Sequence, residues 1–440
     1  MRTSLWLGKM FIFACMLFGF ITFEQAAEVL APFPDTSDLS KVSIKLTRSS
    51  CFGTCPDYSV TISGDGTVHY SGKYRVLIPG DHVSYIRPAA VRELLDQFRK
   101  ANFFAARDRY RYNATDLPTY VVSLTIGSQT KTVIDYYGIK DGMPATITNL
   151  EDQIDKTADT ARWIESNDNT VPALRAEKWP FGSSDQRNLN IYVGAVKKKN
   201  NALVNEFLAA KTPISTPSQN GDIPICVATQ YGDLSLVQRM IAATTTFSEK
   251  VLNQCFASAA RSGNLAMLQF WLDRGANPKS SQNKSQLGAE SDLLPSAIQS
   301  RNIAIVRKLL EYKLNLNTTV GNQTLLSWAL FFDVMQHNPD KVKIDEIIVL
   351  LIHSGVDINA RDHSGRTALM ENAFVEDAVR WLLTAGADPT LVAPDGRTAL
   401  RTAQEFRCLP CVRMIQDAIA ARAKLTQSPQ NDRPTPLFKK

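Results

Sequence analysis

The pentapeptide GRTAL occupies Gly365–Leu369 and recurs at Gly396–Leu400, 31 positions further along the chain. The first copy lies in HSGRTALMENAFVEDAVRWLLTAGADP (363–389), and the second lies in PDGRTALRTAQEFRCLPCVRMIQ (394–416). A short segment that recurs at a fixed period is typical of proteins built from stacked structural units. The recurrence therefore predicts a repeat architecture for the C-terminal half of the chain.

Units with the same layout extend upstream of these two copies. Each unit is expected to hold a short first helix with a small residue near its middle, a turn, a second helix with a Leu-rich face and often a closing glycine. The marks of the first helices are Ala195, Ala228, Ala259, Ala297, Ala329, Asn372 and Ala403. Their spacings run from 31 to 43 positions, which fits a unit of about 33 residues with longer loops in some copies.

Packing explains why these residue types recur. Small residues on the first helices let neighbouring units approach closely, and the second helices supply leucines to the seam between units. Glycine closes a helix because it enters the left-handed conformation without a steric penalty. The leucines are Leu268, Leu272, Leu309, Leu310, Leu382 and Leu383, and the closing glycines are Gly275, Gly355 and Gly386.

Three elements of these units resemble the ankyrin repeat. DHSGRTALMENA and PDGRTALRTAQ resemble the opening of that repeat, YGDLSLVQRMI, SGNLAMLQFWL and RNIAIVRKLL resemble its middle, and RGANP, SGVDIN and AGADP resemble its ending. The Pro and His of the opening are replaced by Ala368 and Met370 in one unit and by Ala399 and Arg401 in the next. The resemblance implies an all-α solenoid of about seven repeats over residues 187–422.

The resemblance also implies a concave binding surface, made by the first helices and by the loops, or fingers, between units. The best defined fingers are residues 360–366, the first finger, and residues 393–397, the second finger. Loop residues that packing does not require are the best candidates for recognition, and here they are Arg361, His363, Arg366 and Arg397. In the alternative interpretation these side chains are only solvated, and Asp362, Gly365, Asp395 and Gly396 only shape the turns.

The N-terminal half has a different pattern. Residues 41–47, 57–62, 67–70, 118–126 and 129–137 alternate as strands do, with a Gly-Asp-Gly turn at 64–66. Residues 89–101 place Val91, Leu94, Leu95 and Phe98 on one helical face, and a closing helix is expected from Leu150 to Ile164. Strands, a helix, strands and a helix predict an α+β domain over residues 38–165.

Part of this domain resembles a bacterial domain family of unknown function. The resemblance lies in a CFGxCPxY signature and its surroundings, and the residues are Arg48, Cys51, Phe52, Gly53, Cys55, Pro56, Tyr58, Asp116, Pro118 and Thr119. It implies no activity, because the family has none assigned.

The first 27 residues read as a signal peptide. Arg2 and Lys9 precede the apolar run 10–23, and Ala26 and Ala27 follow at the place expected for cleavage. The run is shorter than the roughly 20 residues that span a bilayer. We therefore expect a periplasmic or secreted protein without a membrane span after cleavage. The alternative is an inner-membrane protein anchored by an uncleaved signal.

The cysteines fit an oxidising compartment. Cys51 and Cys55 form one close pair, Cys408 and Cys411 form another, and each pair is a disulfide candidate, whereas Cys226 and Cys255 stand alone. For Cys51 and Cys55 two alternatives are open: a zinc site with His69 or His82, or a reactive thiol pair favoured by Arg48. For Cys408 and Cys411 the alternative is a redox role, because a helix begins there.

The remaining segments and the charge complete the picture. Residues 166–186 are rich in turn formers and read as a linker, and residues 423–440 read as a mobile tail. A formal charge of +6 over 440 residues makes nucleic acid a poor partner. No phosphate loop, nucleophile elbow, zinc-protease or dinucleotide motif is present, so neither an enzyme activity nor a cofactor or metal is expected. The sequence thus predicts a monomeric module that binds an unidentified protein, with a redox protein or an architectural envelope component as alternatives.

Overall fold

The computed structural model describes residues 32–242, 246–279, 293–335 and 341–427. The expected signal at 1–27 and the end of the expected tail lie outside these residues. The chain divides into two compact units, the first ending at Ile164 and the second beginning at Glu165. Each unit is described by itself.

The first unit is built around a seven-stranded sheet. Its strands are β1 (Val42–Arg48), β2 (Asp57–Ser63), β3 (Thr67–Tyr74), β4 (Gly80–Tyr85), β5 (Arg109–Arg111), β6 (Tyr120–Ile126) and β7 (Gln129–Tyr136). Their order in the sheet is β4-β3-β2-β1-β6-β7-β5, and every pair is antiparallel except β5 with β7. The expected α+β character is therefore found as a mixed sheet with helices.

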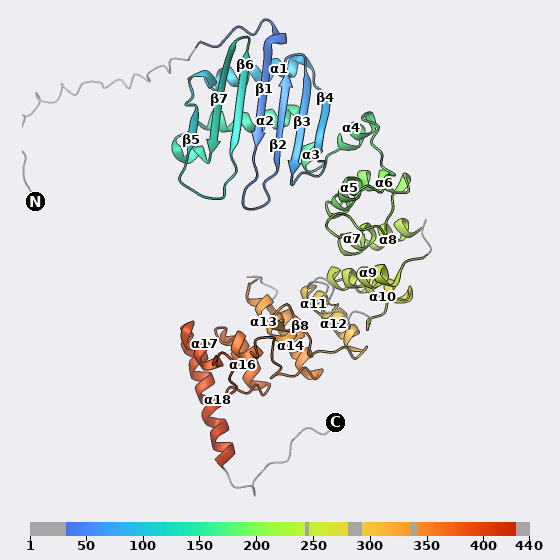
Figure 1. The fold of residues 1–440 in the computed structure, drawn as a ribbon, viewed down its shortest axis with the longest axis vertical. Coiled ribbons are helices and arrows are strands. Elements are labelled where there is room, and N and C mark those ends of the chain that lie inside the picture. The colour runs from blue at the N-terminus through green and yellow to red at the C-terminus, as the bar shows by residue number, and fades with distance from the viewer. Residues whose placement is uncertain (1–31, 243–245, 280–292, 336–340, 428–440) are drawn as a thin grey trace, which may run out of the picture. The chain divides into compact units, whose positions relative to one another are not determined.

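Helices cover one face of this sheet. They are α1 (Pro88–Lys100), α2 (Ala145–Ala158) and α3 (Ala161–Ile164), and Figure 1 shows α1 and α2 behind the strands. Alternate residues of the strands point toward α1 and α2 and form the core with them. All four residues expected on the buried face of α1 are buried there: Val91, Leu94, Leu95 and Phe98.

The expected closing helix is divided. Asp159 follows α2 in the left-handed conformation, with φ of 51°, so the chain turns before α3 begins. The turn lets Trp163 and Ile164 accept backbone hydrogen bonds from Ile78 and Leu77, which precede β4. A single helix would not have brought α3 to this edge of the sheet.

The second unit is helical. Its first helices are α5 (Gln186–Lys197), α7 (Pro224–Tyr231), α9 (Glu249–Ser262), α11 (Leu293–Gln299), α13 (Leu325–Met335), α15 (Ala368–Glu371) and α17 (Ala399–Glu405). Its second helices are α6 (Asn201–Ala209), α8 (Leu234–Ile241), α10 (Leu265–Asp273), α12 (Ile303–Leu310), α14 (Lys341–His353), α16 (Glu376–Thr384) and α18 (Leu409–Gln427). A two-stranded hairpin, β8 (Thr319–Val320) with β9 (Gln323–Thr324), precedes α13.

Consecutive first helices pack against one another through the marked small residues. Contacts join α5 to α7, α7 to α9, α9 to α11, α11 to α13, α13 to α15 and α15 to α17. All seven marks are fully buried: Ala195, Ala228, Ala259, Ala297, Ala329, Asn372 and Ala403. The sequence period thus reports a real stacking contact, because a larger side chain at these positions would push the neighbouring helix away.

Polar side chains begin several of the second helices. The side chains of Asn200, Asp233, Asn264 and Asn302 accept a hydrogen bond from a backbone N–H in the first turn of α6, α8, α10 and α12, respectively. Such N-caps satisfy donors that the helix itself leaves without a partner.

The segment expected as a linker is folded. Residues 166–186 contain α4 (Thr170–Ala176), which packs on α6. Leu174 and Phe181 are buried, and the Phe181 ring lies against Phe207 of α6 with 5.4 Å between ring centroids. The linker expectation is corrected: these buried residues and the hydrogen bond from Trp179 Nε1 to Asn188 Oδ1 at 3.0 Å dock the segment. The boundary of the expected tail also moves, since α18 continues to Gln427.

Candidate functional site: the fingers before α15 and α17

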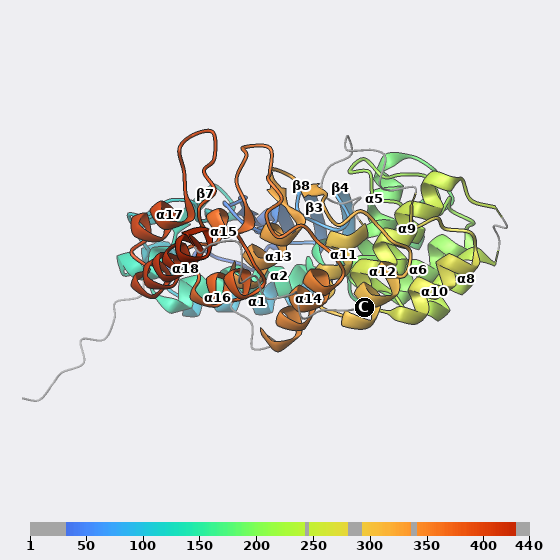
Figure 2. The same cartoon turned by 90° about the horizontal axis from the view of Figure 1, so that it is seen from below.

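The two expected fingers precede α15 and α17 and project on the same side of the helix pairs (Figure 2). In the first finger, Asp362 Oδ1 accepts hydrogen bonds from the backbone N–H of Ser364 and of Arg366, both at 2.8 Å. Gly365 has φ of 73°, and an isolated bridge joins Arg361 to Thr367 at the base. Asp362 and Gly365 therefore shape this turn.

The second finger has the same construction. Ala393 donates from its backbone N–H to the oxygen of Arg397 at 2.9 Å, and Asp395 Oδ1 accepts from the N–H of Arg397 at 3.0 Å. This backbone bond and the nearby Arg366 guanidinium lower the pKa of the Asp395 carboxyl. Asp395 is therefore ionised at neutral pH and available as an acceptor.

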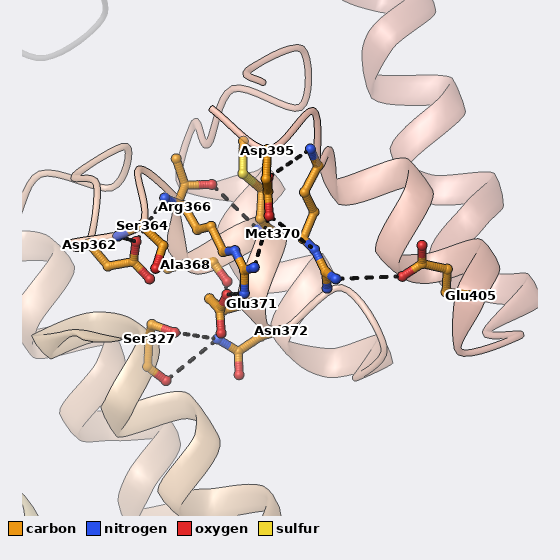
Figure 3. Close-up of polar contacts among 12 residues, drawn as sticks. Ser327, Asp362, Ser364, Arg366, Ala368, Met370, Glu371, Asn372, Asp395 and Glu405 are labelled. Atoms are coloured by element: carbon orange, nitrogen blue, oxygen red, sulfur yellow. Dashed lines mark hydrogen bonds and ion pairs between the residues drawn. The ribbon is translucent and has the colours of Figure 1, made fainter. Parts of the chain in front are cut away.

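Two arginines connect the fingers to each other. Arg361 Nη1 donates to the backbone oxygen of Gly365 at 2.6 Å and to that of Val392, directly before the second finger, at 3.0 Å. Arg366 donates through Nη1 to Glu371 Oε1 at 3.0 Å and through Nη2 to Asp395 Oδ2 at 2.9 Å. Figure 3 shows Arg366 between these two carboxylates. Both side chains thus hold neighbouring units together.

The other two candidate residues are less engaged within the fold. His363 is exposed at the tip of the first finger. Arg397 lies 4.0 Å from Asp395 Oδ2 and 3.9 Å from Glu405 Oε2, at the limit of an ion pair. Of the four predicted contact residues, His363 and Arg397 therefore have the weakest side-chain contacts within the fold.

Below the fingers, Asn372 replaces the small residue of the other first helices. Its Nδ2 donates to Ser327 Oγ at 3.1 Å and to the backbone oxygen of Ala368 at 3.0 Å. Figure 3 shows this amide reaching Ser327 on the preceding first helix, α13. Sequence reasoning missed Ser327 because it lies in another unit, Asp395 because it was assigned only to a turn, and Glu371 because the first helix was read only for its small and apolar residues.

Three disulfides lie within the described residues. They join Cys51 to Cys55, Cys408 to Cys411 and Cys226 to Cys255. The last corrects the expectation that Cys226 and Cys255 stand alone. These residues lie on α7 and α9, first helices that pack together, so a separation of 29 positions becomes a contact.

The signature residues of the first unit gather at one end of its sheet. Arg48, at the end of β1, donates to Asp155 at 2.8 Å and to Asp152 at 2.9 Å, and its guanidinium lies 4.4 Å from the centroid of the Tyr120 ring. Tyr58 donates to Asp155 at 2.7 Å, and burial raises the pKa of its hydroxyl, which stays protonated. The arrangement orders the ends of β1, β2 and β6 against α2.

The Cys51–Cys55 loop lies directly beside this cluster. Backbone hydrogen bonds hold it to a neighbouring loop, from Phe52 N–H to Asp116 oxygen at 3.2 Å and from Ser49 N–H to Thr119 oxygen at 3.0 Å. The Phe52 side chain is 89% exposed. The signature thus builds a closed loop that presents one aromatic side chain to solvent.

No described helix combines the length and apolar character needed to span a bilayer. In the same part of the chain, no group of three or more His, Cys, Asp or Glu side chains is arranged to hold a metal ion.

Family models match a part of each unit. Residues 42–158 match the family model described as "Domain of unknown function (DUF6438)", and residues 340–426 match "Ankyrin repeats (3 copies)". The chain therefore carries a DUF6438 domain followed by ankyrin repeats, and the match to the repeat model includes both fingers.

Two individual proteins are similar to parts of the chain. An L-asparaginase from Dirofilaria immitis is 29% identical over 110 residues, which are 24% of this chain and 19% of that protein, so the chain spans about a fifth of its length. One chain in the solved complex of the predatory endopeptidase Bd0816 from Bdellovibrio bacteriovorus with immunity protein Bd3460 is 22% identical. It covers 46% of this chain and 99% of its own length, with a TM-score of 0.34.

Proposed function

We propose that this protein is an exported, non-enzymatic module that binds a protein partner through the fingers and first helices of an ankyrin-like solenoid formed by the helix pairs α5/α6 to α17/α18. Ankyrin repeats are typical of protein–protein interaction modules, and the match at 340–426 supports this class of function. The N-terminal DUF6438 domain receives no activity in this proposal.

One observation carries the choice of surface. Arg361 and Arg366 tie the first finger to the segment that forms the second. A braced pair of loops loses little conformational entropy when a partner binds, because its shape is already fixed. The exposed His363 and the loosely paired Arg397 are then held at defined positions and can contact a partner without first leaving a strong internal bond.

Export is supported by the cysteines. The chain has seven, and the six beyond Cys15 form three disulfides. Complete pairing is expected where thiols are oxidised and is rare in a reducing cytosol. The charged start and the apolar run at 10–23 point the same way. Fractionation of cells followed by sequencing of the mature N-terminus tests this point, and a full-length chain recovered in the cytosol would contradict it.

Site-specific photo-crosslinking tests the binding surface. A photoreactive residue is placed at His363 in the full chain, and the matched control carries it at Arg413, an exposed position on the second helix α18. We expect a discrete crosslinked protein from position 363 and none from position 413, in material from the compartment where the chain resides. Equal crosslinking from both positions, or none from either, would overturn the assignment.

Charge reversal then separates recognition from folding. Arg397→Glu is expected to weaken binding of the captured partner. Because the Arg397 side chain is 31% exposed and lies near Asp395 and Glu405, the thermal midpoint is measured beside the affinity, and a loss of affinity in a variant that stays folded at the assay temperature identifies recognition. Arg413→Glu makes the same change in charge outside the fingers and should leave affinity unchanged. Reversal at Arg361 is not used, since it would remove the bonds to Gly365 and Val392.

A further inference from the structure

The second helix of the last unit begins differently from α6, α8, α10 and α12. Asn200, Asp233, Asn264 and Asn302 cap α6, α8, α10 and α12 with a side-chain oxygen. Cys408 occupies the corresponding place directly before α18, and its Sγ lies 3.3 Å from the backbone nitrogen of Cys411, which donates to it. Its carbonyl oxygen accepts the next backbone bond, from Val412 at 3.0 Å. A sulfur atom thus occupies the capping position of a 19-residue helix.

We propose that Cys408 and Cys411 form a redox-active pair, in which Cys408 is the sulfur that exchanges with the thiols of a dithiol protein. A neutral thiol is a weak acceptor and a poor cap, whereas a thiolate is a strong acceptor. The N-terminus of a helix carries partial positive charge and favours an anion. Reduction therefore releases Cys408 as a stabilised thiolate, which makes the disulfide more oxidising than one without such a position.

Exposure selects Cys408 as the exchanging sulfur. Cys411 is fully buried, whereas Cys408 is half-buried. Two apolar side chains flank it in the open: Phe406 is 60% and Leu409 is 67% exposed, and the Phe406 ring stacks on Phe374 at 4.7 Å. An apolar surface around an accessible sulfur fits a partner whose cysteine lies in an apolar segment.

A purely structural role explains this disulfide poorly. Cys226–Cys255 links two repeats across 29 positions, whereas Cys408–Cys411 spans three positions at the start of one helix. The entropy that a cross-link removes from the unfolded chain falls as the closed loop becomes shorter. Backbone hydrogen bonds already order this turn, so the bond adds little to the fold.

The exchange is balanced as follows. A thiolate of the dithiol protein attacks Cys408 Sγ, a mixed disulfide forms, and Cys411 leaves as a thiolate that takes up a proton. The second thiol of the partner then loses its proton and attacks the partner's first sulfur, the one bonded to Cys408 Sγ. This step releases Cys408 as a thiolate. The partner is oxidised to a disulfide and the pair is reduced by two electrons; in the reverse direction the partner is reduced.

The relative ease of reduction tests the proposal without any variant. The full chain is equilibrated in mixtures of reduced and oxidised dithiothreitol, quenched by alkylation and mapped by mass spectrometry. We expect Cys408–Cys411 to become half-reduced at a dithiol fraction at least about tenfold lower than Cys51–Cys55 or Cys226–Cys255 requires, equivalent to about 30 mV. Reduction of Cys408–Cys411 together with, or after, the other two pairs would overturn the proposal.

The acidity of Cys408 supplies a second test. Cys411→Ala leaves Cys408 as a free thiol, and Cys51→Ala leaves Cys55 as a free thiol away from any helix start. Rates of alkylation measured against pH should give Cys408 a pKa of about 7.5 or lower and Cys55 one near the ordinary value of about 8.5. A Cys408 that titrates with Cys55 would contradict the capping argument. If Cys411→Ala fails to retain its helical circular dichroism, the reduction experiment on the unaltered chain decides.

Discussion

Cys226 and Cys255 are joined by a disulfide between α7 and α9, the first helices of two consecutive units. Both residues are buried. Among the described residues from Glu165 onward, no other disulfide joins two helix pairs. The disulfide adds a covalent bond to the packing contact between α7 and α9. The stability of the helical part of the chain should therefore depend on it.

Replacing both cysteines of this pair with alanine should destabilise the repeats. The bond closes a loop of 29 positions in the unfolded chain, and its loss is expected to lower the free energy of unfolding by about 2 to 4 kcal/mol. Urea denaturation followed by helical circular dichroism measures the change. The Cys51→Ala, Cys55→Ala double variant, altered in the first unit, should leave the helical transition in place. An unchanged midpoint after loss of Cys226–Cys255 would show that packing alone fixes this seam.

Glu151→Gln should stabilise the first unit at neutral pH. Glu151 of α2 is buried, and burial followed by the nearby Asp135 of β7 raises the pKa of its carboxyl to about 9. The unfolded chain ionises this group near its ordinary pKa, so the folded state is penalised progressively as pH rises from about 4.5 toward 9. Glutamine keeps a neutral donor for Asp135 and removes the penalty, a gain of about 1 to 3 kcal/mol at neutral pH.

Thermal unfolding across that pH range checks the sign. The unaltered chain should lose more stability between acid and mildly alkaline pH than the Glu151→Gln variant does. Glu93→Gln is the matched control, because it makes the same chemical change on α1 of the same unit at an exposed position. The control should keep the pH dependence of the unaltered chain. Equal slopes for Glu151→Gln and the unaltered chain would mean that Glu151 is ionised in the fold.

Arg48→Met should destabilise the first unit. The Arg48 side chain is 13% exposed and that of its partner Asp155 is 18% exposed, so its removal leaves a largely buried carboxylate without its cation. Breaking such a pair costs about 3 to 5 kcal/mol. Hydrogen exchange of peptides from β1 and α2 should rise accordingly. Arg48→Lys should lose less, since one ammonium keeps the charge but cannot reproduce the separate bonds to Asp152 and Asp155. Exchange unaffected by Arg48→Met would contradict the structural role.

Much of the fold could be predicted from the sequence, because the spacing of apolar and small residues indicates which of them are buried. The four apolar residues of α1 and the seven marks of the first helices recur at the spacing of a helix or of a repeat, and all of them are buried. Helix α4 was not predicted because turn formers surround Leu174, its one buried apolar residue. Its docking depends on α6, a contact that no local pattern encodes.

The candidate site was harder to predict because its contacts join residues from different units. Arg366 reads as an ordinary loop cation, and only the stacking of units brings Asp395, 29 positions later, within 2.9 Å of it. Cys226 and Cys255 were missed in the same way, although a separation close to the repeat period was the available signal. Contacts between units can be predicted from period and register together, but not from either residue alone.

Arg366→Gln should loosen the second finger without unfolding the repeats. Arg366 bonds Glu371 in its own unit and Asp395 in the next, so its loss removes one of the two arginine links between the fingers, while the Arg361 bond to Val392 and the Thr367 and Thr398 caps of α15 and α17 remain. We expect faster hydrogen exchange at the backbone N–H groups of the second finger and little change in the thermal midpoint. Arg380→Gln is the matched control, because Arg380 also pairs with two carboxylates, Glu376 and Asp377, but both lie within its own helix α16. Finger exchange that stays unchanged in Arg366→Gln, or rises equally in Arg380→Gln, would show that the bridge does not brace the fingers.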